Sequence, residues 1–168
     1  MITEIGEHKA CRVPHLIGKV AVGFSDGFIR LYDLEGGFCV ATLKGQHRGL
    51  INSMLMMGSR LFSAGEDGLI VEWDVSKKGT ALRSSNIHKS AVTALCTDEK
   101  YLVSVSRDGT VTFFKSAALE VVKNVSVMES LEDVKPVGDG KFLIVGDKGA
   151  VRTITLDGLS RSSDRLAA

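Results

Sequence analysis

The feature that most constrains this chain is a glycine-containing turn that recurs about every 41 residues. The dipeptides Asp26-Gly27, Asp67-Gly68 and Asp108-Gly109 are spaced by 41 residues, and Lys148-Gly149 follows after 40 more. An apolar run stands before each dipeptide and another stands after it. Asp-Gly between two such runs predicts a tight hairpin, because the turn needs a residue that adopts a positive φ. The sequence therefore predicts the same hairpin in each of its repeats.

Each hairpin is expected to lie within a larger unit. The hairpin strands are predicted at 20–23 with 28–32, 61–64 with 69–73, 102–105 with 110–114, and 142–145 with 150–154. Further apolar strands are predicted before the hairpins, at 51–56 and 91–96, and after them, at 38–43 and 119–124. Four strands in about 41 residues make one blade of a β-propeller. The composition of 18 Gly and only 2 Pro agrees with an all-β chain of short hairpins.

On these motifs the chain resembles the WD-repeat β-propeller family over about Lys19 to Leu156. Gly45-Gln46-His47 stands near the usual Gly-His pair of the family, and Trp73-Asp74 matches its Trp-Asp pair. In this family a His, a Ser or Thr, the turn Asp and the Trp form a hydrogen-bonded chain inside each blade. The resemblance implies members of such a chain at His47, Ser63, Asp67 and Trp73, and at His88, Ser104 and Asp108. Repeats one and four depart from this pattern.

The resemblance also sets the expected domain organisation. Residues 1–18 are expected to be an N-terminal segment, either a strand of the first blade or a piece that closes the ring, and 157–168 a flexible tail. Residues 19–156 are expected to form the blades. Propellers that resemble this chain have about seven blades, within a general range of about four to eight. Three arrangements stay open: a fragment or a short version of a ring whose remaining blades come from another chain, two copies that pair into an eight-bladed ring, or a closed four-blade ring.

Composition excludes several classes of protein. Lys+Arg number 21 and Asp+Glu 20, so no general attraction to nucleic acid or to an anionic membrane is expected. No apolar run is long enough for a spanning helix. Cys11, Cys39 and Cys96 are odd in number and far apart, which argues against a disulfide framework or a zinc site. An intracellular protein, of the cytoplasm or nucleus, is predicted, with Cys39 and Cys96 as small core residues of strands.

No enzyme, metal or cofactor is predicted. His47 and His88 stand in register with the repeat, which favours a structural role over a catalytic or metal-binding one. The regular spacing of the turn aspartates places each in a different blade, too far apart for paired acid–base work. The sequence contains no Gly-x-Ser-x-Gly elbow, dinucleotide fingerprint or phosphate-binding loop.

The remaining prediction is a surface that binds other proteins. In propellers that this chain resembles, partners dock on the rim where the hairpin turns and the loops before the innermost strands emerge. The resulting candidates are Ser25, Arg48, Glu66, Lys89, Arg107 and Asp147. The expected function is a non-catalytic scaffold within a multi-subunit complex or a self-associated ring, with nucleic acid contacted only indirectly. The alternative is a structural subunit of a ribonucleoprotein or ribosome-biogenesis assembly, since Ile70-Val71-Glu72-Trp73 and the degenerate end blades resemble subunits of the small-subunit processome.

Overall fold

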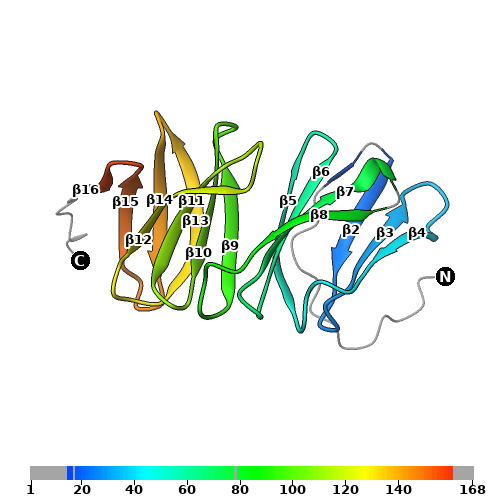
Figure 1. The fold of residues 1–168 in the computed structure, drawn as a ribbon, viewed down its shortest axis with the longest axis horizontal. Coiled ribbons are helices and arrows are strands. Elements are labelled where there is room, and N and C mark those ends of the chain that lie inside the picture. Colours follow the sequence, from blue (N-terminus) through cyan, green and yellow to red (C-terminus); the bar gives the residue numbers. More distant parts are fainter. Residues whose placement is uncertain (1–14, 17, 78, 161–168) are drawn as a thin grey trace. The chain divides into compact units, whose positions relative to one another are not determined.

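A computed structural model describes residues 15–16, 18–77 and 79–160 of the chain (Figure 1). The chain divides after Val92 into two compact units, and each is described by itself. The strands form four antiparallel sheets of four strands, and within each sheet the strands lie in chain order. This arrangement confirms the predicted all-β fold and its four-stranded blades. The described residues include no helix that is long and apolar enough to cross a membrane.

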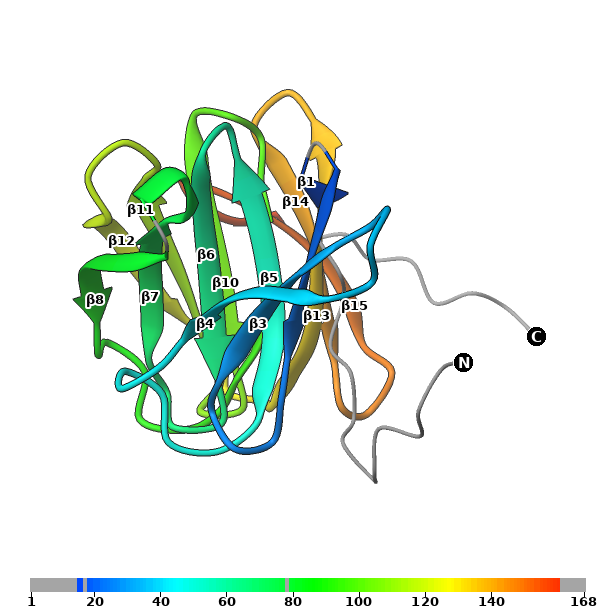
Figure 2. The ribbon, with the colours of Figure 1, turned by 90° about the vertical axis from the view of Figure 1, so that its right-hand side faces the viewer.

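The first unit contains blades 1 and 2 (Figure 2). Blade 1 consists of β1 (His15–Leu16), β2 (Lys19–Gly23), β3 (Ile29–Asp33) and β4 (Cys39–Leu43). Blade 2 consists of β5 (Ile51–Met57), β6 (Arg60–Gly65), β7 (Ile70–Asp74) and β8 (Thr80–Ser85), with the short 3₁₀ helix η1 (Val75–Lys77) before β8.

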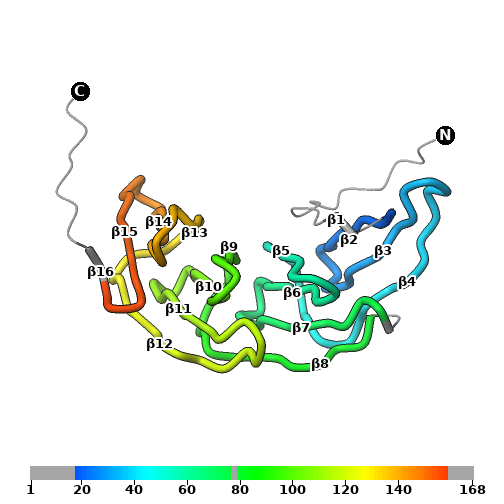
Figure 3. Tube along the Cα trace, turned by 90° about the horizontal axis from the view of Figure 1, so that it is seen from above, coloured from blue at the N-terminus to red at the C-terminus, as the bar shows by residue number. Residues whose placement is uncertain are grey.

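The second unit contains blades 3 and 4, and its chain can be followed from green to red in Figure 3. Blade 3 consists of β9 (Val92–Thr97), β10 (Tyr101–Ser106), β11 (Thr110–Lys115) and β12 (Glu120–Ser126). Blade 4 consists of β13 (Leu131–Gly138), β14 (Lys141–Gly146), β15 (Val151–Thr155) and β16 (Gly158–Ser160). The division between the units falls after the first residue of β9.

The repeated turn has the geometry that the Asp-Gly dipeptides predict. The four turn glycines share one left-handed conformation: φ is 80° at Gly27 and Gly68, 79° at Gly109 and 77° at Gly149. In blade 1 the Asp26 carboxylate also accepts the backbone N–H of Phe28 at 2.9 Å. Asp67 and Asp108 hold the corresponding N–H groups of their own turns at 3.1 and 2.9 Å. The aspartate therefore fixes the turn that the glycine makes possible.

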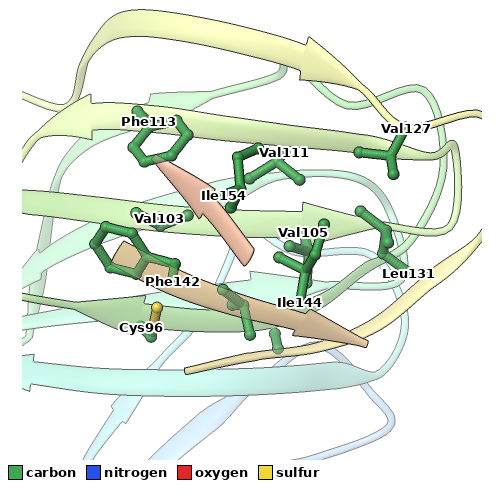
Figure 4. Close-up of a cluster of buried hydrophobic side chains, with 12 residues drawn as sticks. Cys96, Val103, Val105, Val111, Phe113, Val127, Leu131, Phe142, Ile144 and Ile154 are labelled. Carbon is green, nitrogen blue, oxygen red and sulfur yellow. The ribbon is translucent and has the colours of Figure 1, made fainter. Parts of the chain in front are cut away.

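Each unit has its own apolar core between its two blades. In the second unit, alternate side chains of β10 and β11 meet those of β13 and β14, as Figure 4 shows. The rings of Phe113 and Phe142 meet edge to face, with centroids 5.6 Å apart and planes at 79°. The first unit has an equivalent cluster that includes Ile29, Leu61 and Trp73. Alternation along the strands thus buries one face of each sheet against the neighbouring sheet of its unit.

The structure differs from the sequence predictions at Cys39 and at the start of the tail. Cys96 is buried, but Cys39 is exposed, because it lies on β4, the outermost strand of its sheet. The predicted flexible tail 157–168 begins with ordered backbone, since Gly158–Ser160 forms β16 and pairs with β15; residues 161–168 lie outside the described part. Within the predicted segment 1–18, His15–Leu16 forms β1 and pairs with β2, and residues 1–14 also lie outside that part.

Candidate functional site: the rim of hairpin turns

In the first unit the turns and loops at one end of the blades contact one another directly. A Cβ at Gly27 would lie 2.6 Å from the carbonyl oxygen of His47. A Cβ at Gly68 would lie 2.9 Å from the carbonyl oxygen of His88 and 3.1 Å from that of Ser90. Only glycine fits such close approaches of backbone to backbone. Residues 25–27, 47–50, 66–68 and 88–90 together are called the first rim segment.

The first rim segment carries four of the sequence-predicted binding residues. The side chains of Ser25, Arg48, Glu66 and Lys89 are all exposed. The backbone N–H of Glu66 donates to the carbonyl oxygen of Leu50 at 2.8 Å, which ties the second turn to the preceding loop. Positive and negative side chains therefore stand on neighbouring loops whose backbones hold one another.

Beneath this segment, blade 2 contains a continuous hydrogen-bonded chain. The indole N–H of Trp73 donates to Ser63 Oγ at 2.8 Å, and Ser63 Oγ lies 2.8 Å from His47 Nε2. His47 Nδ1 lies 3.1 and 3.2 Å from the two carboxylate oxygens of Asp67. The structure thus brings together all four residues that the family resemblance named for this repeat.

The hydrogen-bonded chain of blade 2 reaches the rim itself. Asp67 Oδ2 accepts the backbone N–H of Arg48 at 2.8 Å, and Asp67 Oδ1 accepts that of Leu69 at 3.1 Å. One carboxylate therefore holds the His47 ring, the hairpin turn and the loop that carries Arg48. Through these contacts the buried Trp73 of β7 is connected to an exposed binding candidate.

Burial favours the neutral form of His47 in this hydrogen-bonded chain. The pKa of His47 lies below its ordinary value of 6.5, chiefly because burial disfavours the charged ring, although the neighbouring Asp67 acts in the opposite direction. The neutral ring can accept at Nε2 from the Ser63 hydroxyl and donate from Nδ1 to Asp67. Ser63 in turn accepts from Trp73, so each donated proton of this hydrogen-bonded chain has one acceptor.

In blade 1 an arginine contacts the turn aspartate. Arg30 Nη2 lies 3.0 Å from Asp26 Oδ2, and its guanidinium stacks over the ring of buried Phe24 at 4.2 Å from the centroid. Arg30 lies on β3, on the strand that leaves the turn. A cation from the blade's own sheet therefore contacts Asp26, the turn aspartate equivalent to Asp67, which the His47 ring contacts in blade 2.

The second unit has a rim segment of its own, formed by residues 107–109, 127–130 and 147–149. A Cβ at Gly109 would lie 2.9 Å from the carbonyl oxygen of Glu129, and Val127 N–H donates to the carbonyl oxygen of Gly109 at 2.7 Å. Asp147 N–H donates to that of Ser130 at 2.9 Å. The predicted binding residues Arg107 and Asp147 are exposed on these turns.

This second rim segment also contains residues that the sequence analysis missed. Glu129 is largely buried and forms an ion pair with Arg152 at 3.3 Å. A Cβ at Gly146 would contact the Glu129 side chain at 2.8 Å, just as one at Gly65 would contact the ring of His47 at 2.8 Å. Glu129 thus occupies the histidine position of blade 4: it follows His88 by 41 residues, as His88 follows His47, and it precedes the turn residue Lys148 by 19 residues rather than 20. The available signal was the 41-residue spacing from His47 to His88, which leads on to Glu129.

Met128, beside Glu129, is also a residue that sequence reasoning missed. Its side chain is 96% exposed, and its φ is +60°, a conformation that few residues other than glycine adopt. No motif in the sequence marks this position. The tight loop between β12 and β13 therefore displays one large apolar side chain among charged ones.

The hydrogen-bonded chain implied for repeat three is not assembled within either unit. His88 belongs to the first unit, whereas Ser104 and Asp108 belong to the second. His88 and Ser104 are buried, and Asp108 accepts the backbone N–H of Thr110 at 2.9 Å. The joining of these residues in one chain stays a prediction.

A family model matches two stretches of the chain. The model described as "WD domain, G-beta repeat" matches residues 37–74 and 79–115, which contain the two repeats with a His, a Ser and a turn Asp. The chain contains WD repeats. The matched stretches end just beyond Trp73 in repeat two and Phe114 in repeat three, at the strand that follows each turn.

Curated relatives agree with this assignment. The WD-repeat chain is 32% identical over 143 residues to the p21-activated protein kinase-interacting protein 1-like of Danio rerio, a match that covers 80% of this chain and 38% of the relative. It is 34% identical over 146 residues to the nuclear distribution protein nudF of Emericella nidulans, covering 81% of this chain and 32% of the relative. The chain therefore spans less than two-fifths of the length of these relatives.

Solved structures show the same fold. The computationally designed Ika8 protein matches with a TM-score of 0.80 and 21% identity, over 90% of this chain and 48% of that one. A chain in the mitotic checkpoint complex matches with a TM-score of 0.79 and 17% identity, over 92% of this chain and 50% of that one. At these identities the likeness concerns the β-propeller fold alone.

The WD-repeat network of blade 2 makes stability sensitive to acid. Because the pKa of His47 lies below its ordinary value of 6.5, the folded protein holds fewer protons at this ring than the unfolded chain does below that pH. Acid therefore favours unfolding, and the stability from neutral His47 is complete above the unfolded pKa and lost as pH falls beneath it. We expect the urea midpoint to fall more steeply from about pH 8 to about pH 5 in the wild type than in His47→Gln, which cannot be protonated. Equal slopes for the two proteins would contradict a buried neutral ring.

Proposed function

We propose that this WD-repeat chain is a non-catalytic scaffold that binds other proteins through its two rim segments within a larger assembly. The observation that carries the proposal is the exposure of charged side chains on loops whose backbones hold one another. Arg48, Glu66 and Lys89 are exposed on the first rim segment, and Arg107 and Asp147 on the second.

Rigid display supports binding. The close approaches at Gly27, Gly68 and Gly109 leave the turns little room to move, and Asp67 fixes the loop of Arg48 from below. A partner that meets preorganised side chains loses little ordering entropy on binding, so modest contacts suffice. The blades therefore supply the stiffness, and the exposed side chains supply the specificity.

The charge pattern favours a protein partner over a phosphate backbone. Both rim segments carry charges of both signs, and the whole chain has a formal net charge of +1. A nucleic acid backbone would favour clustered positive side chains, whereas interleaved signs fit discrete ion pairs with a folded protein or peptide. The names of relatives, such as a kinase-interacting protein in Danio rerio and a CCR4-associated factor 4 homolog in Candida glabrata, also describe proteins that act with others.

A non-catalytic role agrees with how the candidate acid–base residues are used. His47 and Asp67 contact each other and hold the loop of Arg48, so their hydrogen-bonding atoms are engaged within the blade. The proposed setting is intracellular, which is supported by the free thiols of Cys39 and Cys96.

Charge reversal on the rim tests the proposal. The variant Glu66→Lys with Arg107→Glu changes one exposed charge in each unit and leaves the net charge unchanged. The matched control, Glu35→Lys with Lys100→Glu, does the same at exposed turns at the opposite ends of the strands. In affinity purification of the tagged full chain from cells, the control should recover the same partners as the wild type. The rim variant should recover at least about tenfold less of them, which corresponds to a loss of about 1.4 kcal/mol in binding free energy.

Both variants are expected to unfold within about 0.5 kcal/mol of the wild type, because the substituted side chains are exposed. Arg107 does contact Glu132 at 3.6 Å, but both side chains are about half exposed, so losing this pair costs little. Equal recovery of partners by the rim variant and the control would contradict binding at the rim. If RNA is recovered and the co-purified proteins are bound through that RNA, this result would contradict a protein-binding scaffold.

A further inference from the structure

The loop between β12 and β13 is fixed on both sides of Met128. Val127 is buried in the core of the second unit, where Figure 4 shows its side chain, and its backbone N–H donates to the carbonyl oxygen of Gly109 at 2.7 Å. On the other side, the largely buried Glu129 pairs with Arg152 at 3.3 Å. The backbone at Met128 is therefore held in place by its two neighbours.

The conformation held in this way is unfavourable for methionine. The φ of Met128 is +60°, a region that is costly for a residue with a Cβ and that glycine adopts freely. The described part of the chain has four non-glycine residues with a positive φ. Of the other three, Leu119 buries its side chain, and Glu99 and Asp139 carry polar side chains on exposed turns. Met128 is the one of the four that combines a positive φ with an exposed apolar side chain.

Neither property of Met128 stabilises the fold. Its side chain is 96% exposed, against 59% for Phe38, the next most exposed large apolar side chain of the described residues. An apolar side chain that stays in water contributes no burial energy, and the positive φ adds a conformational cost. Glycine at this position would remove both disadvantages. A backbone outlier that its surroundings hold in place therefore points to a function of the side chain.

The loop of Met128 lies against both hairpin turns of the second rim segment. It meets one turn through the close approach at Gly109, and it meets the other through the 2.9 Å hydrogen bond from Asp147 N–H to the carbonyl oxygen of Ser130. Arg107 and Asp147 are exposed on these turns, so charges of both signs stand beside the apolar side chain. An apolar anchor within a polar border is the arrangement found in protein interfaces. An anionic membrane or a nucleic acid would instead favour clustered basic side chains.

We propose that Met128 is the apolar anchor of the second rim segment and inserts into an apolar pocket of a partner protein, with Arg107 and Asp147 facing charges at the border of that pocket. This inference rests on the proposed binding at the rim and adds the chemistry that the partner must present. The methionine side chain is unbranched and polarisable, so it adapts to the shape of a pocket. The fixed backbone beneath it means that little order is lost on binding. Full burial of this side chain is expected to raise the affinity at least about tenfold.

Two substitutions at position 128 separate the side chain from the backbone. The test measures the affinity of the purified full chain for the protein that the tagged wild type recovers from cells. Met128→Gly removes the side chain and suits the positive φ, so the affinity should fall at least about tenfold while the urea midpoint does not fall. Met128→Leu keeps an apolar side chain and should retain most of the affinity. The matched control, Glu99→Gly, makes the same change at a φ of +75° on the turn between β9 and β10, at the opposite end of blade 3, and should leave the affinity unchanged.

A photoreactive diazirine amino acid at position 128 locates the contact. Irradiation should crosslink it to an apolar stretch of the partner, and crosslinks to RNA or lipid alone would overturn the proposal. Equal losses of affinity in Met128→Gly and Met128→Leu would also overturn it, because an apolar side chain would then not suffice. If Met128→Gly binds normally while Glu66→Lys with Arg107→Glu loses its partners, the anchor fails and binding at the rim stands. If both variants bind normally, or if the wild type recovers no protein, both proposals fail.

Discussion

Phe142→Ala is expected to reduce the free energy of unfolding by about 3–5 kcal/mol, the largest effect of any single substitution considered for this chain. Phe142 is fully buried on β14 and contacts Phe113 of β11 edge to face, so it joins the two sheets of the second unit. Alanine would remove this contact and leave a cavity between blades 3 and 4. Urea unfolding followed by circular dichroism measures the loss.

The matched control is Phe38→Ala, because Phe38 is 59% exposed at the start of β4. Its removal should change the free energy of unfolding by less than about 1 kcal/mol, since little of the ring leaves water on folding. Similar losses in Phe142→Ala and Phe38→Ala would contradict the placement of the core between the two sheets.

Trp73→Phe is expected to cost about 1–3 kcal/mol, because it removes a buried N–H donor and leaves Ser63 Oγ one partner short. The ring is 2% exposed, and its N–H lies 2.8 Å from Ser63 Oγ. Packing is largely kept by phenylalanine, so the cost reports mainly on the hydrogen bond. Blade 3 has Phe114 at the equivalent position, fully buried, so the fold accommodates this ring.

A double-mutant cycle with Ser63→Ala separates the hydrogen bond from packing. The two substitutions should couple by about 0.5–3 kcal/mol, because each one already breaks the bond that the other would remove. Additive losses would show that Trp73 and Ser63 stabilise blade 2 independently, contrary to the hydrogen-bonded chain.

Much of the fold could be predicted because the turn chemistry is local. Asp-Gly dictates the hairpin from two adjacent residues, and the apolar runs beside it then form β6 and β7 around Asp67, or β10 and β11 around Asp108. The exposure of Cys39 could not be predicted in the same way. A strand of apolar residues can be central or outermost in its sheet. β4 is outermost because it pairs with β3 on one side and with no other strand of its sheet.

The candidate site was predictable where residues keep the repeat spacing. His47, Ser63 and Asp67 stand at family positions. The Glu129–Arg152 pair instead has a glutamate at the histidine position, in a repeat where Lys148 replaces the turn aspartate. An ion pair between a loop and a strand depends on tertiary placement, so neither residue type nor spacing alone identifies it. The same holds for Arg30 and Asp26 in blade 1.

In each unit of this WD-repeat chain, rigid turns with exposed charges of both signs stand at one end of the blades, and this is the end proposed to bind partners. Within each unit, the turns between the second and third strands of each sheet lie at that end, and the turns between the third and fourth strands lie at the other. Antiparallel pairing imposes this separation, because successive turns alternate between the two ends of a sheet. The turns at the opposite end therefore serve as an internal control when the effect of a bound partner on the rim turns is measured.

Hydrogen exchange of the full chain, alone and with a partner recovered by affinity purification, tests binding at the rim most directly. Binding at the rim should slow exchange at residues 66–68 and 107–109 and leave the opposite turns 35–37 and 98–100 unchanged. Protection confined to the opposite turns would contradict it.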